Sequence, residues 1–293
     1  MPELIRKKKK MSSFEMIAFG FAGVILLGAI ILMLPISSSA GVVTPFDKTL
    51  FTATSAVCVT GLVVVDTGSY WSAFGQAVIL LLIQTGGLGV ITVVASFSMV
   101  SGRKISLMQR STMQDAISAP KVGGIVRLTK FILQGTFLIE LVGAILMLPV
   151  FCKDYGWKGI WMSVFHSVSA FCNAGMDIIG ENSLCDYSGN VLINAVTAAL
   201  IILGGLGYIV WWDVSRVIKN RKQNGGRFFK SLTLHSKIVF ISTAFLLIVG
   251  TALTLCFEYN NPLTLEGLPL SDKIQAAFFQ SVTTRTAGFA SLP

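Results

Sequence analysis

The stretch FTATSAVCVTGL, Phe51–Leu62, decides the fold class of this chain. It follows Phe14–Leu34, an apolar run of about 20 residues, which at about 1.5 Å per residue can cross a hydrocarbon core of about 30 Å. The stretch itself is too short to cross, because Asp47–Val57 can make only about three helical turns before the turn at Gly61. We therefore predict a short helix that enters the membrane from one side and stops at mid-depth. Non-helical backbone at that depth is tolerated only where it is buried in protein or lines a water-filled path.

The composition indicates an integral membrane protein. Of the 293 residues, 53% are hydrophobic and only 13% are charged, and the mean hydropathy is +0.74, whereas a soluble domain has about 25% charged residues. A soluble helical core would need polar faces that the apolar runs lack. The first run is also longer than the roughly 7–15 residues of a signal-peptide core. Further spans are predicted at Ala73–Ser101, Val126–Val150, Val191–Trp212 and Lys237–Phe257.

The basic residues predict the orientation. Eighteen of the 23 Lys and Arg residues lie before the first span, or in the connections between the second and third and between the fourth and fifth spans, counted with the first residues of the span that follows. Because Lys and Arg mark cytoplasmic loops, we expect a multi-pass chain in the lipid bilayer with a cytoplasmic N-terminus, and no nucleic-acid partner. The predicted organisation is a basic cytoplasmic N-terminus at 1–13, a first helix–pore-loop–helix unit at 14–101, a cytoplasmic loop at 102–125, a second unit at 126–215, a cytoplasmic loop at 216–235 and an incomplete third unit at 236–293.

The chain repeats itself with a period of about 114 residues. LMLP occurs at Leu32–Pro35 and again at Leu146–Pro149. The same shift aligns the opening stretch with FHSVSAFCNAGM at Phe165–Met176, and a further shift of 113 residues aligns it with FFQSVTTRTAGF at Phe278–Phe289. The repeated unit is a span, an exit that ends in Pro, a short half-helix, a Gly turn and a second span. Such a repeat decides the architecture before any single motif is considered.

The Gly turns predict an ion path. Gly61, Gly175 and Gly288 occupy the same place in each repeat, and glycine permits backbone angles that let several carbonyls point one way. The carbonyl end of a helix favours a cation, and a ring of carbonyls that replaces an ion's water shell makes a potassium filter. Three copies favour this interpretation over re-entrant packing elements. The predicted backbone ligands are Val59, Thr60, Gly61, Asn173, Ala174, Gly175, Thr286, Ala287 and Gly288, with Cys58, Cys172 and Arg285 as filter support.

At these segments the sequence resembles the Trk/Ktr/HKT superfamily of potassium transporters, in particular the membrane subunit of the bacterial Ktr system. TSAVCVTGLVVVDTGSYW, FHSVSAFCNAGMD and TTRTAGF look like the first three filter segments of that family. The resemblance implies an all-α membrane protein of helix–pore-loop–helix units, pseudo-fourfold in the complete protein. It also implies passive, sodium-influenced potassium uptake in the bacterial plasma membrane, with sodium as a coupling or activating ion. A homodimer and a cytosolic nucleotide-binding regulatory subunit are the implied partners.

The family has four units, whereas this chain ends at Pro293, inside the third. We expect a C-terminally truncated transporter that is inactive alone, because stranded backbone groups on the open side would cost several kcal/mol each. The resemblance further implies that serine in place of Gly61 relaxes the preference for potassium. Met176 stands where the other repeats have Leu62 and Phe289, and we expect it to adjust packing behind the filter.

Three side chains in the predicted membrane segments carry specific expectations. Glu140 lies mid-span, either on a permeation path or buried against a Ser, Thr or Asn neighbour. His166 should hydrogen-bond a neighbouring segment rather than sense pH. Arg285 should point away from the ion and hold a carbonyl or an acid such as Asp66. The five cysteines show neither a CxxC pair nor zinc spacing with the two histidines, so we expect free thiols, no cofactor, and no metal except potassium at the filter.

Two other function classes are weighed against the ion path. A solute carrier that works by alternating access typically has broken helices in inverted repeats, whereas each unit here starts on the inside. A membrane-embedded enzyme would need a motif such as GxSxG or HExxH, and the chain has neither, so no enzyme is predicted. The GGLG clusters at Gly86–Gly89 and Gly204–Gly207 indicate close helix packing rather than phosphate binding, because no strand precedes them.

Overall fold

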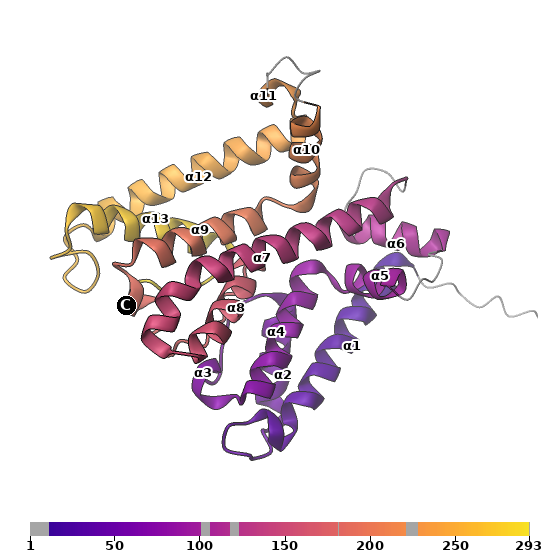
Figure 1. Ribbon diagram of the computed structural model, residues 1–293, viewed down its shortest axis with the longest axis horizontal. Helices are drawn as coiled ribbons and strands as arrows, with labels where there is room; N and C mark the ends of the chain where they lie inside the picture. Colours follow the sequence, from indigo (N-terminus) through magenta and orange to yellow (C-terminus); the bar gives the residue numbers. More distant parts are fainter. Residues whose placement is uncertain (1–11, 101–105, 118–122, 181, 221–227, 293) are drawn as a thin grey trace, which may run out of the picture.

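The structure is a computed structural model that describes residues 12–100, 106–117, 123–180, 182–220 and 228–292. Within these ranges the chain is helical apart from its connections, and an isolated β-bridge joins Ser38 to Trp71. Figure 1 shows the helices in groups that follow the order of the chain. The all-α fold expected from the sequence is confirmed.

The first group contains the first predicted span and the first short helix. α1 begins with a capping box, in which Ser12 and Glu15 each accept a hydrogen bond from the other's backbone N–H. α2 packs against both α1 and α4, and its 13 residues are close to the three turns expected. The elements of this group are α1 (Ser13–Met33), η1 (Pro35–Ser37), α2 (Phe46–Cys58), α3 (Thr67–Tyr70), α4 (Ala73–Leu88) and α5 (Val90–Val100).

The second and third groups repeat this order. α8 packs against α7 and α9, and α13 packs against α12. α6 (Leu107–Ile117) contacts α1, α5 and α7 and so joins the first group to the second. The second group consists of α7 (Ile125–Tyr155), α8 (Lys158–Phe171), η2 (Cys185–Tyr187), α9 (Val191–Gly205) and α10 (Tyr208–Lys219), and the third of α11 (Phe228–Ser231), α12 (Leu234–Glu258) and α13 (Leu270–Thr286).

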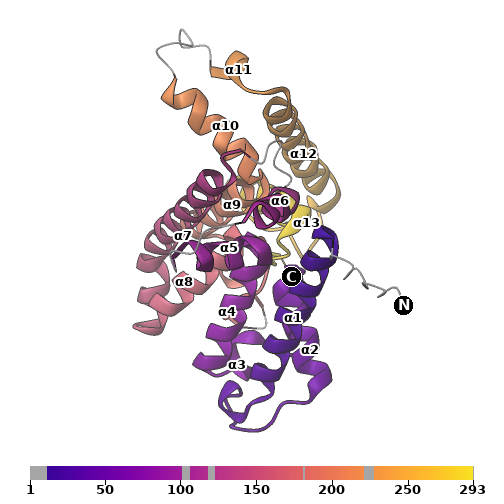
Figure 2. The same cartoon turned by 90° about the vertical axis from the view of Figure 1, so that its right-hand side faces the viewer.

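Consecutive groups meet through their short helices. α8 of the second group contacts α4 of the first, and α13 of the third contacts α9 of the second (Figures 1 and 2). One large apolar cluster contains side chains of all three short helices, among them Ala53, Phe165 and Val282. Because each junction has the same form, the groups succeed one another around a common centre at which the short helices end.

Three described helices, α1, α7 and α12, are long and apolar enough to cross a membrane. Two bent pairs, α4 with Val90–Phe97 and α9 with α10, raise the number to five if each pair is one span. None of the most apolar 18-residue window of α12 is buried against the rest of the protein. α12 contacts α13 and α10, but its apolar side chains stay partly or fully uncovered in the described structure, as those of a helix in lipid do.

The spans differ from the sequence prediction in two respects. Pro149 does not end the third span, because α7 continues through it to Tyr155. The predicted spans 73–101 and 191–212 are each two helices, bent by 100° and 95°. The bends lie at Gly89, with φ of +82°, and at Gly207, with φ of +87°. Glycine adopts such angles readily because it has no Cβ that would clash with the backbone.

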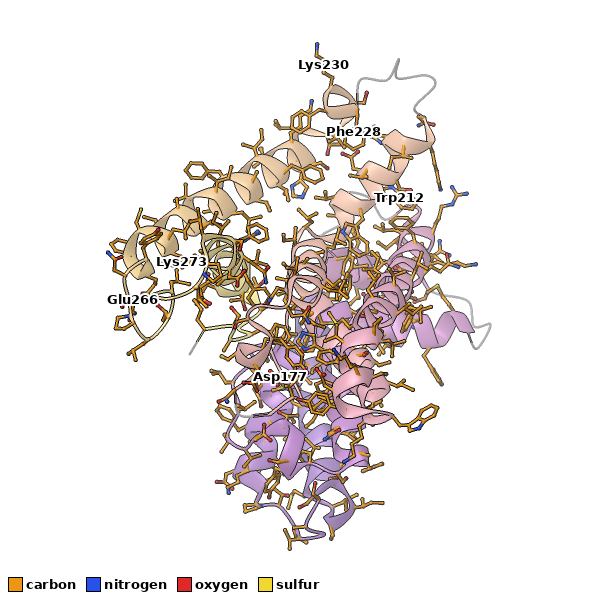
Figure 3. The ribbon with its side chains drawn as sticks, turned by 60° about the vertical axis from the view of Figure 1, so that its left-hand side comes forward. Asp177, Trp212, Phe228, Lys230, Glu266 and Lys273 are labelled. Atoms are coloured by element: carbon orange, nitrogen blue, oxygen red, sulfur yellow. The ribbon has the colours of Figure 1, made fainter. Side chains whose placement is uncertain are left out.

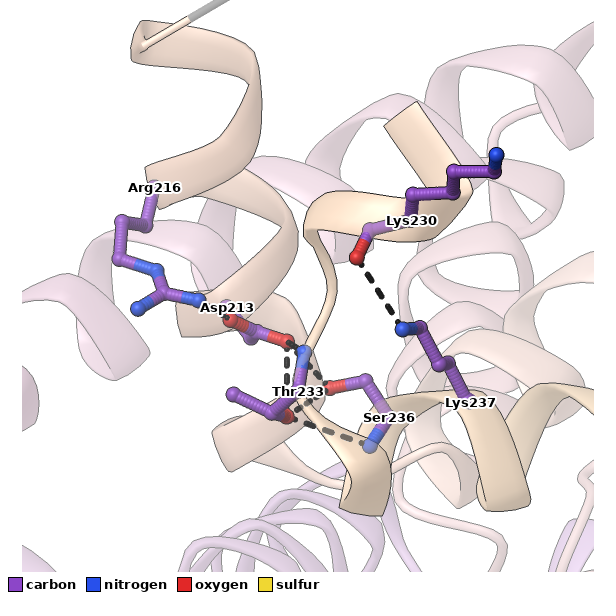
Figure 4. A network of polar contacts seen from close by, with 6 residues as sticks. All are labelled: Asp213, Arg216, Lys230, Thr233, Ser236 and Lys237. Atoms are coloured by element: carbon purple, nitrogen blue, oxygen red, sulfur yellow. Dashed lines mark hydrogen bonds and ion pairs between the residues drawn. The ribbon is translucent and has the colours of Figure 1, made fainter. Parts of the chain in front are cut away.

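A buried carboxylate joins the second bent pair to the third group. Asp213 of α10 accepts hydrogen bonds at Oδ2 from the backbone N–H and Oγ1 of Thr233 (2.8 and 2.9 Å) and from Oγ of Ser236 (2.7 Å). Its Oδ1 accepts from Nη2 of Arg216 at 2.5 Å, and nearby Lys237 donates to the carbonyl of Lys230 (Figure 4). Because Thr233 also caps α12, this one carboxylate fixes α10 against the start of α12.

Candidate permeation site

The short helices α2, α8 and α13 each end in a turn that contains a glycine with positive φ. Gly61, Gly175 and Gly288 all have positive φ, at +74°, +66° and +87°. Val59 and Asn173, at equivalent places in the first two turns, also have positive φ, at +58° and +59°. Positive φ at alternate residues is rare outside glycine and marks backbone that the surrounding structure holds in place.

A Ser or Thr residue near the end of each short helix anchors the turn that follows. Ser55, Ser169 and Thr283 lie 114 residues apart, and the carbonyl of each accepts a backbone hydrogen bond from its own turn, at 3.0, 2.8 and 3.1 Å. The hydroxyls of Ser169 and Thr283 donate to the carbonyls of Met176 and Phe289, and the hydroxyl of Ser55 pairs with that of Thr60. Sequence reasoning missed these residues, although the shift of 114 aligns Ser55 with Ser169 and Thr283 lies one residue from the corresponding place in the third repeat.

The carbonyls of neighbouring turns converge at the glycines. A Cβ at Gly61 would lie 2.8 Å from the carbonyl oxygen of Ala174 and 3.3 Å from that of Ala287. A Cβ at Gly175 would lie 1.8 Å from the carbonyl oxygen of Ala287. The three predicted filter segments are therefore close together. The carbonyl oxygens of Ala174 and Ala287 occupy the space that a side chain at Gly61 or Gly175 would need. Such a carbonyl cluster can replace water around a cation.

A cavity of about 330 Å³ opens above the carbonyl cluster, lined by all three glycines together with Asp66 and Asp177. Asp177 accepts hydrogen bonds from the Ser183 hydroxyl and the Ile179 N–H. Burial raises the pKa of Asp177 above its ordinary value and the charge of Asp66 adds to this, while those hydrogen bonds oppose it. The two acids give the mouth of the site a negative character, which attracts cations.

The GGLG clusters pack directly against the short helices, as predicted. A Cβ at Gly86 would lie 2.1 Å from the carbonyl oxygen of Val57, and one at Gly204 would lie 1.9 Å from that of Phe171. The side-chain amide of Asn173, oriented by its hydrogen-bonding neighbours, donates to the Ile201 carbonyl (3.1 Å) and accepts from the Gly205 N–H (3.3 Å). The second turn is thus tied to the α9 segment just before its bend.

The two cysteines predicted to support the filter differ. Cys58, the last residue of α2, is exposed, whereas Cys172 is buried. Sγ of Cys172 lies 3.9 Å from Oε1 of Gln84 and 3.9 Å from Oε1 of Glu140. All five cysteines are free, as expected. Only the second turn is therefore backed by its cysteine.

Glu140 lies behind the second turn and is 5% exposed. Its Oε2 accepts a hydrogen bond from Nε2 of Gln84 at 3.3 Å, and its backbone carbonyl accepts one from the Ser167 hydroxyl at 2.7 Å. The expected Ser, Thr or Asn partner of the carboxyl is instead a Gln of the first group, together with the Cys172 thiol. Glu140, Gln84 and Cys172, here called the rear cluster, connect α7, α4 and the second turn.

His166 and Arg285 have different outcomes. Nε2 of His166 pairs with the Thr197 hydroxyl of α9 at 3.2 Å, which confirms the expected contact with a neighbouring segment. Its ring also packs on Phe289, with centroids 4.7 Å apart. The expected contact of Arg285 with Asp66 is not formed: Asp66 caps α3 instead, and Arg285 has no hydrogen bond or ion pair with any described residue.

The spans, the short helices that stop just before Gly61, Gly175 and Gly288, and the converging carbonyls define an α-helical membrane protein of repeated span–half-helix units. Residues 13–293 match the TrkH family, described as a cation transport protein family, and the chain belongs to it.

Two curated relatives support this assignment. The potassium/sodium uptake protein NtpJ of Enterococcus hirae is 42% identical over 288 residues, which cover 98% of this chain and 61% of that protein. The Ktr system potassium uptake protein B of Bacillus subtilis is 41% identical over 279 residues, which cover 95% and 60%. The resemblance seen in the sequence is confirmed. The chain thus spans about 60% of the length of these relatives.

A solved structure shares the fold. The potassium transporter TrkH from Vibrio parahaemolyticus superposes with a TM-score of 0.64 at 16% identity, over 99% of this chain and 54% of that chain.

Proposed function

We propose that this chain forms part of a transporter that takes up potassium across the plasma membrane through a carbonyl-lined filter. The observation that carries the proposal is the convergence of three turns, in which Gly61 and Gly175 face carbonyl oxygens of Ala174 and Ala287. A dehydrated potassium ion needs several oxygens on several sides, and backbone carbonyls supply them without a charged ligand. The names of both curated relatives, which specify potassium or potassium and sodium uptake, agree with this cargo.

The predicted ligands are the backbone carbonyls of 59–61, 173–175 and 286–288. Among the described residues no group of three or more His, Cys, Asp or Glu side chains could hold a metal ion, so the site's cation chemistry rests on the carbonyls. Asp66 and Asp177 at the mouth would concentrate cations there. Sodium would act as a coupling or activating ion, and no other cofactor is proposed for this chain.

Growth at low potassium tests the proposal. The full-length gene product, expressed in a bacterial strain that lacks potassium uptake, should restore growth and rubidium influx. The 293-residue chain should fail to do so alone, because the carbonyl cage needs oxygens from every side. Rescue by the full-length product that depends on external sodium would support the sodium role. Full-length protein in the membrane without rubidium influx would contradict the proposed cargo.

The partners and orientation proposed from the resemblance are a homodimer, a cytosolic nucleotide-binding regulatory subunit and a cytoplasmic N-terminus. The orientation places α11 inside and the α12–α13 loop outside. In Figure 3, Lys230 and Glu266 lie at opposite ends of α12, and both are exposed. The residues 121, 181 and 222, which the charge pattern also assigns to opposite sides, lie outside the described residues.

Cysteine labelling tests this orientation. In intact cells, Glu266→Cys should react with a membrane-impermeant maleimide, and Lys230→Cys should react only after the membrane is opened. The parent chain, with its five native cysteines, gives the background. Labelling of Lys230→Cys in intact cells would reverse the orientation of every unit.

A further inference from the structure

A basic cavity lies away from the candidate permeation site, between the first turns of α7 and the face of α10. Its volume is about 540 Å³, and its lining includes Arg127 and Lys130 of α7 and Arg216 and Lys219 of α10. Among the residues that the structure describes, no acidic side chain lines it. In Figure 3, Trp212, which also lines this basic cavity, is well separated from Asp177 at the mouth of the carbonyl cluster.

The cations of the basic cavity are not neutralised within the described part of the chain. Arg127, Lys130 and Lys219 are exposed and make no hydrogen bond or ion pair with any described residue. Arg216 pairs with Asp213, but that carboxylate also accepts three hydrogen bonds from Thr233 and Ser236 on its far side. The side chain of Arg216 stays 52% exposed. Four cations therefore line one cavity with one carboxylate behind them, an arrangement that favours the binding of an anion.

Two aromatic rings place the basic cavity at the membrane surface. Phe131 and Trp212 meet edge to face, with centroids 5.2 Å apart, on the same wall as the cations. Trp is enriched at the level of lipid headgroups, where its ring is in the apolar layer and its N–H in the wet one. Arg and Lys at the first turn of a spanning helix occupy the same level.

An apolar groove continues from the basic cavity. Its volume is about 420 Å³, and it shares Ser215 and Lys219 with the basic cavity. From there it reaches Ile139 of α7, Leu203 of α9 and Phe240 of α12. Ile139 lies eight residues beyond Phe131 along α7, a distance of about 12 Å toward the membrane centre at about 1.5 Å per residue. The basic cavity and the apolar groove thus meet at Ser215 and Lys219. A phospholipid has the same arrangement, with a charged phosphate next to an apolar chain.

We propose that the basic cavity binds the phosphate of an anionic phospholipid, and that one acyl chain of the same lipid fills the apolar groove. Basic pockets between membrane helices on the cytoplasmic side suit such headgroups, and the assignment of this side rests on the proposed orientation. A free phosphate or an acidic protein segment would use the four cations but would leave the apolar groove empty. The lipid would bridge α7 to α10, the arm beyond the bend at Gly207, which Asp213 already fixes to α12.

Native mass spectrometry of the full-length protein tests the proposal. Purified protein is titrated with dioleoylphosphatidylglycerol and, in parallel, with dioleoylphosphatidylcholine. The test variant is Lys130→Gln/Lys219→Gln. The matched control is Lys153→Gln/Lys158→Gln, which removes the same charge from exposed positions at the other end of α7 and the start of α8. We expect the test variant to lose affinity for phosphatidylglycerol about 30-fold, or about 2 kcal/mol, and the control to lose none.

Two further arms separate the sources of the anion. Val214→Trp, which adds bulk to the apolar groove without changing charge, should also weaken phosphatidylglycerol binding. Glycerol phosphate, the headgroup without chains, should not displace the lipid at equal concentration. Equal binding of both lipids, unchanged binding in the test variant, full displacement by glycerol phosphate, or displacement by the cytosolic subunit alone would each overturn the proposal. Rubidium influx is measured separately, so a loss of lipid binding is distinguishable from a failure of the proposed transport.

Discussion

Gly175→Ser should abolish the proposed potassium uptake of the full-length protein. A Cβ at this position would lie 1.8 Å from the carbonyl oxygen and 2.9 Å from the carbonyl carbon of Ala287. These are backbone atoms of another turn, so they cannot rotate away as a flexible side chain could. The φ of +66° adds strain of about 1–3 kcal/mol for any residue with a Cβ. We expect rubidium influx to fall on the order of 100-fold, a change equivalent to about 2.7 kcal/mol.

Gly41→Ser is the matched control for this prediction. Gly41 has φ of +68°, close to that of Gly175, but no atom lies within 4 Å of its Cβ position. Its substitution therefore carries the backbone strain without the collision with a neighbouring turn. Influx should stay within about threefold of the parent at equal protein in the membrane, since strain at a loop acts on stability rather than on the site. Equal losses in both variants would show that strain, and not the carbonyl cluster, explains the result.

The Cβ contacts also predict how strongly substitution of the other two glycines affects influx. At Gly61 the added Cβ would be 2.8 Å from the Ala174 oxygen, a milder overlap than at Gly175, so Gly61→Ser should keep part of the influx while its preference for potassium over sodium relaxes. At Gly288 no described atom lies within 4 Å of the Cβ position. We therefore expect the loss of influx to be largest for the serine variant of Gly175, smaller for that of Gly61 and smallest for that of Gly288. The sequence alone does not predict this order, because the three glycines are equivalent in the repeat.

The architecture was predictable because it repeats. One shift of 114 residues aligns Phe51–Leu62 with Phe165–Met176, and the structure places both segments at the ends of short helices with positive φ at the same glycine. Length and hydropathy then identify α1, α7 and α12 without further information. The same shift aligns Ser55 with Ser169, the residues that anchor the first two turns, although the pattern of glycines alone predicts no role for them.

The remaining features depend on contacts between distant parts of the chain. GGLG predicts close packing, but the sequence does not say that the chain bends by 100° beside Gly86, because a bend depends on what the helix meets. Pro149 predicts a helix end, but α7 continues through it to Tyr155. Gln84 lies 56 residues before Glu140 and gives no local signal of their contact. Periodicity reveals faces and repeats, whereas pairs between repeats require the fold.

The second large effect is expected at Glu140. This residue joins Gln84 and Cys172 in the rear cluster, which supports the second turn from behind. Glu140→Leu removes the acceptor of the Gln84 amide and the polar neighbour of Cys172, whose backbone immediately precedes Asn173. A fully buried donor left without an acceptor costs about 1–3 kcal/mol, and the half-buried Gln84 amide would lose at most that. We expect a lower thermal midpoint of the purified full-length protein and a smaller potassium-to-sodium uptake ratio, since the turn loses its support.

Glu140→Gln should keep most of the uptake ratio, because a glutamine carbonyl of nearly the same volume can still accept from Gln84. Gln84→Leu alone should resemble Glu140→Leu, and the double variant should be little worse than either single one, because partners in one contact give non-additive losses. This cycle distinguishes a positioning role from a direct one. If the Glu140 charge itself lined the ion path, Glu140→Gln would lose uptake as fully as Glu140→Leu, and Gln84→Leu would leave the uptake ratio unchanged. Glu140 is 5% exposed and accepts a hydrogen bond from Gln84, so we expect the positioning outcome.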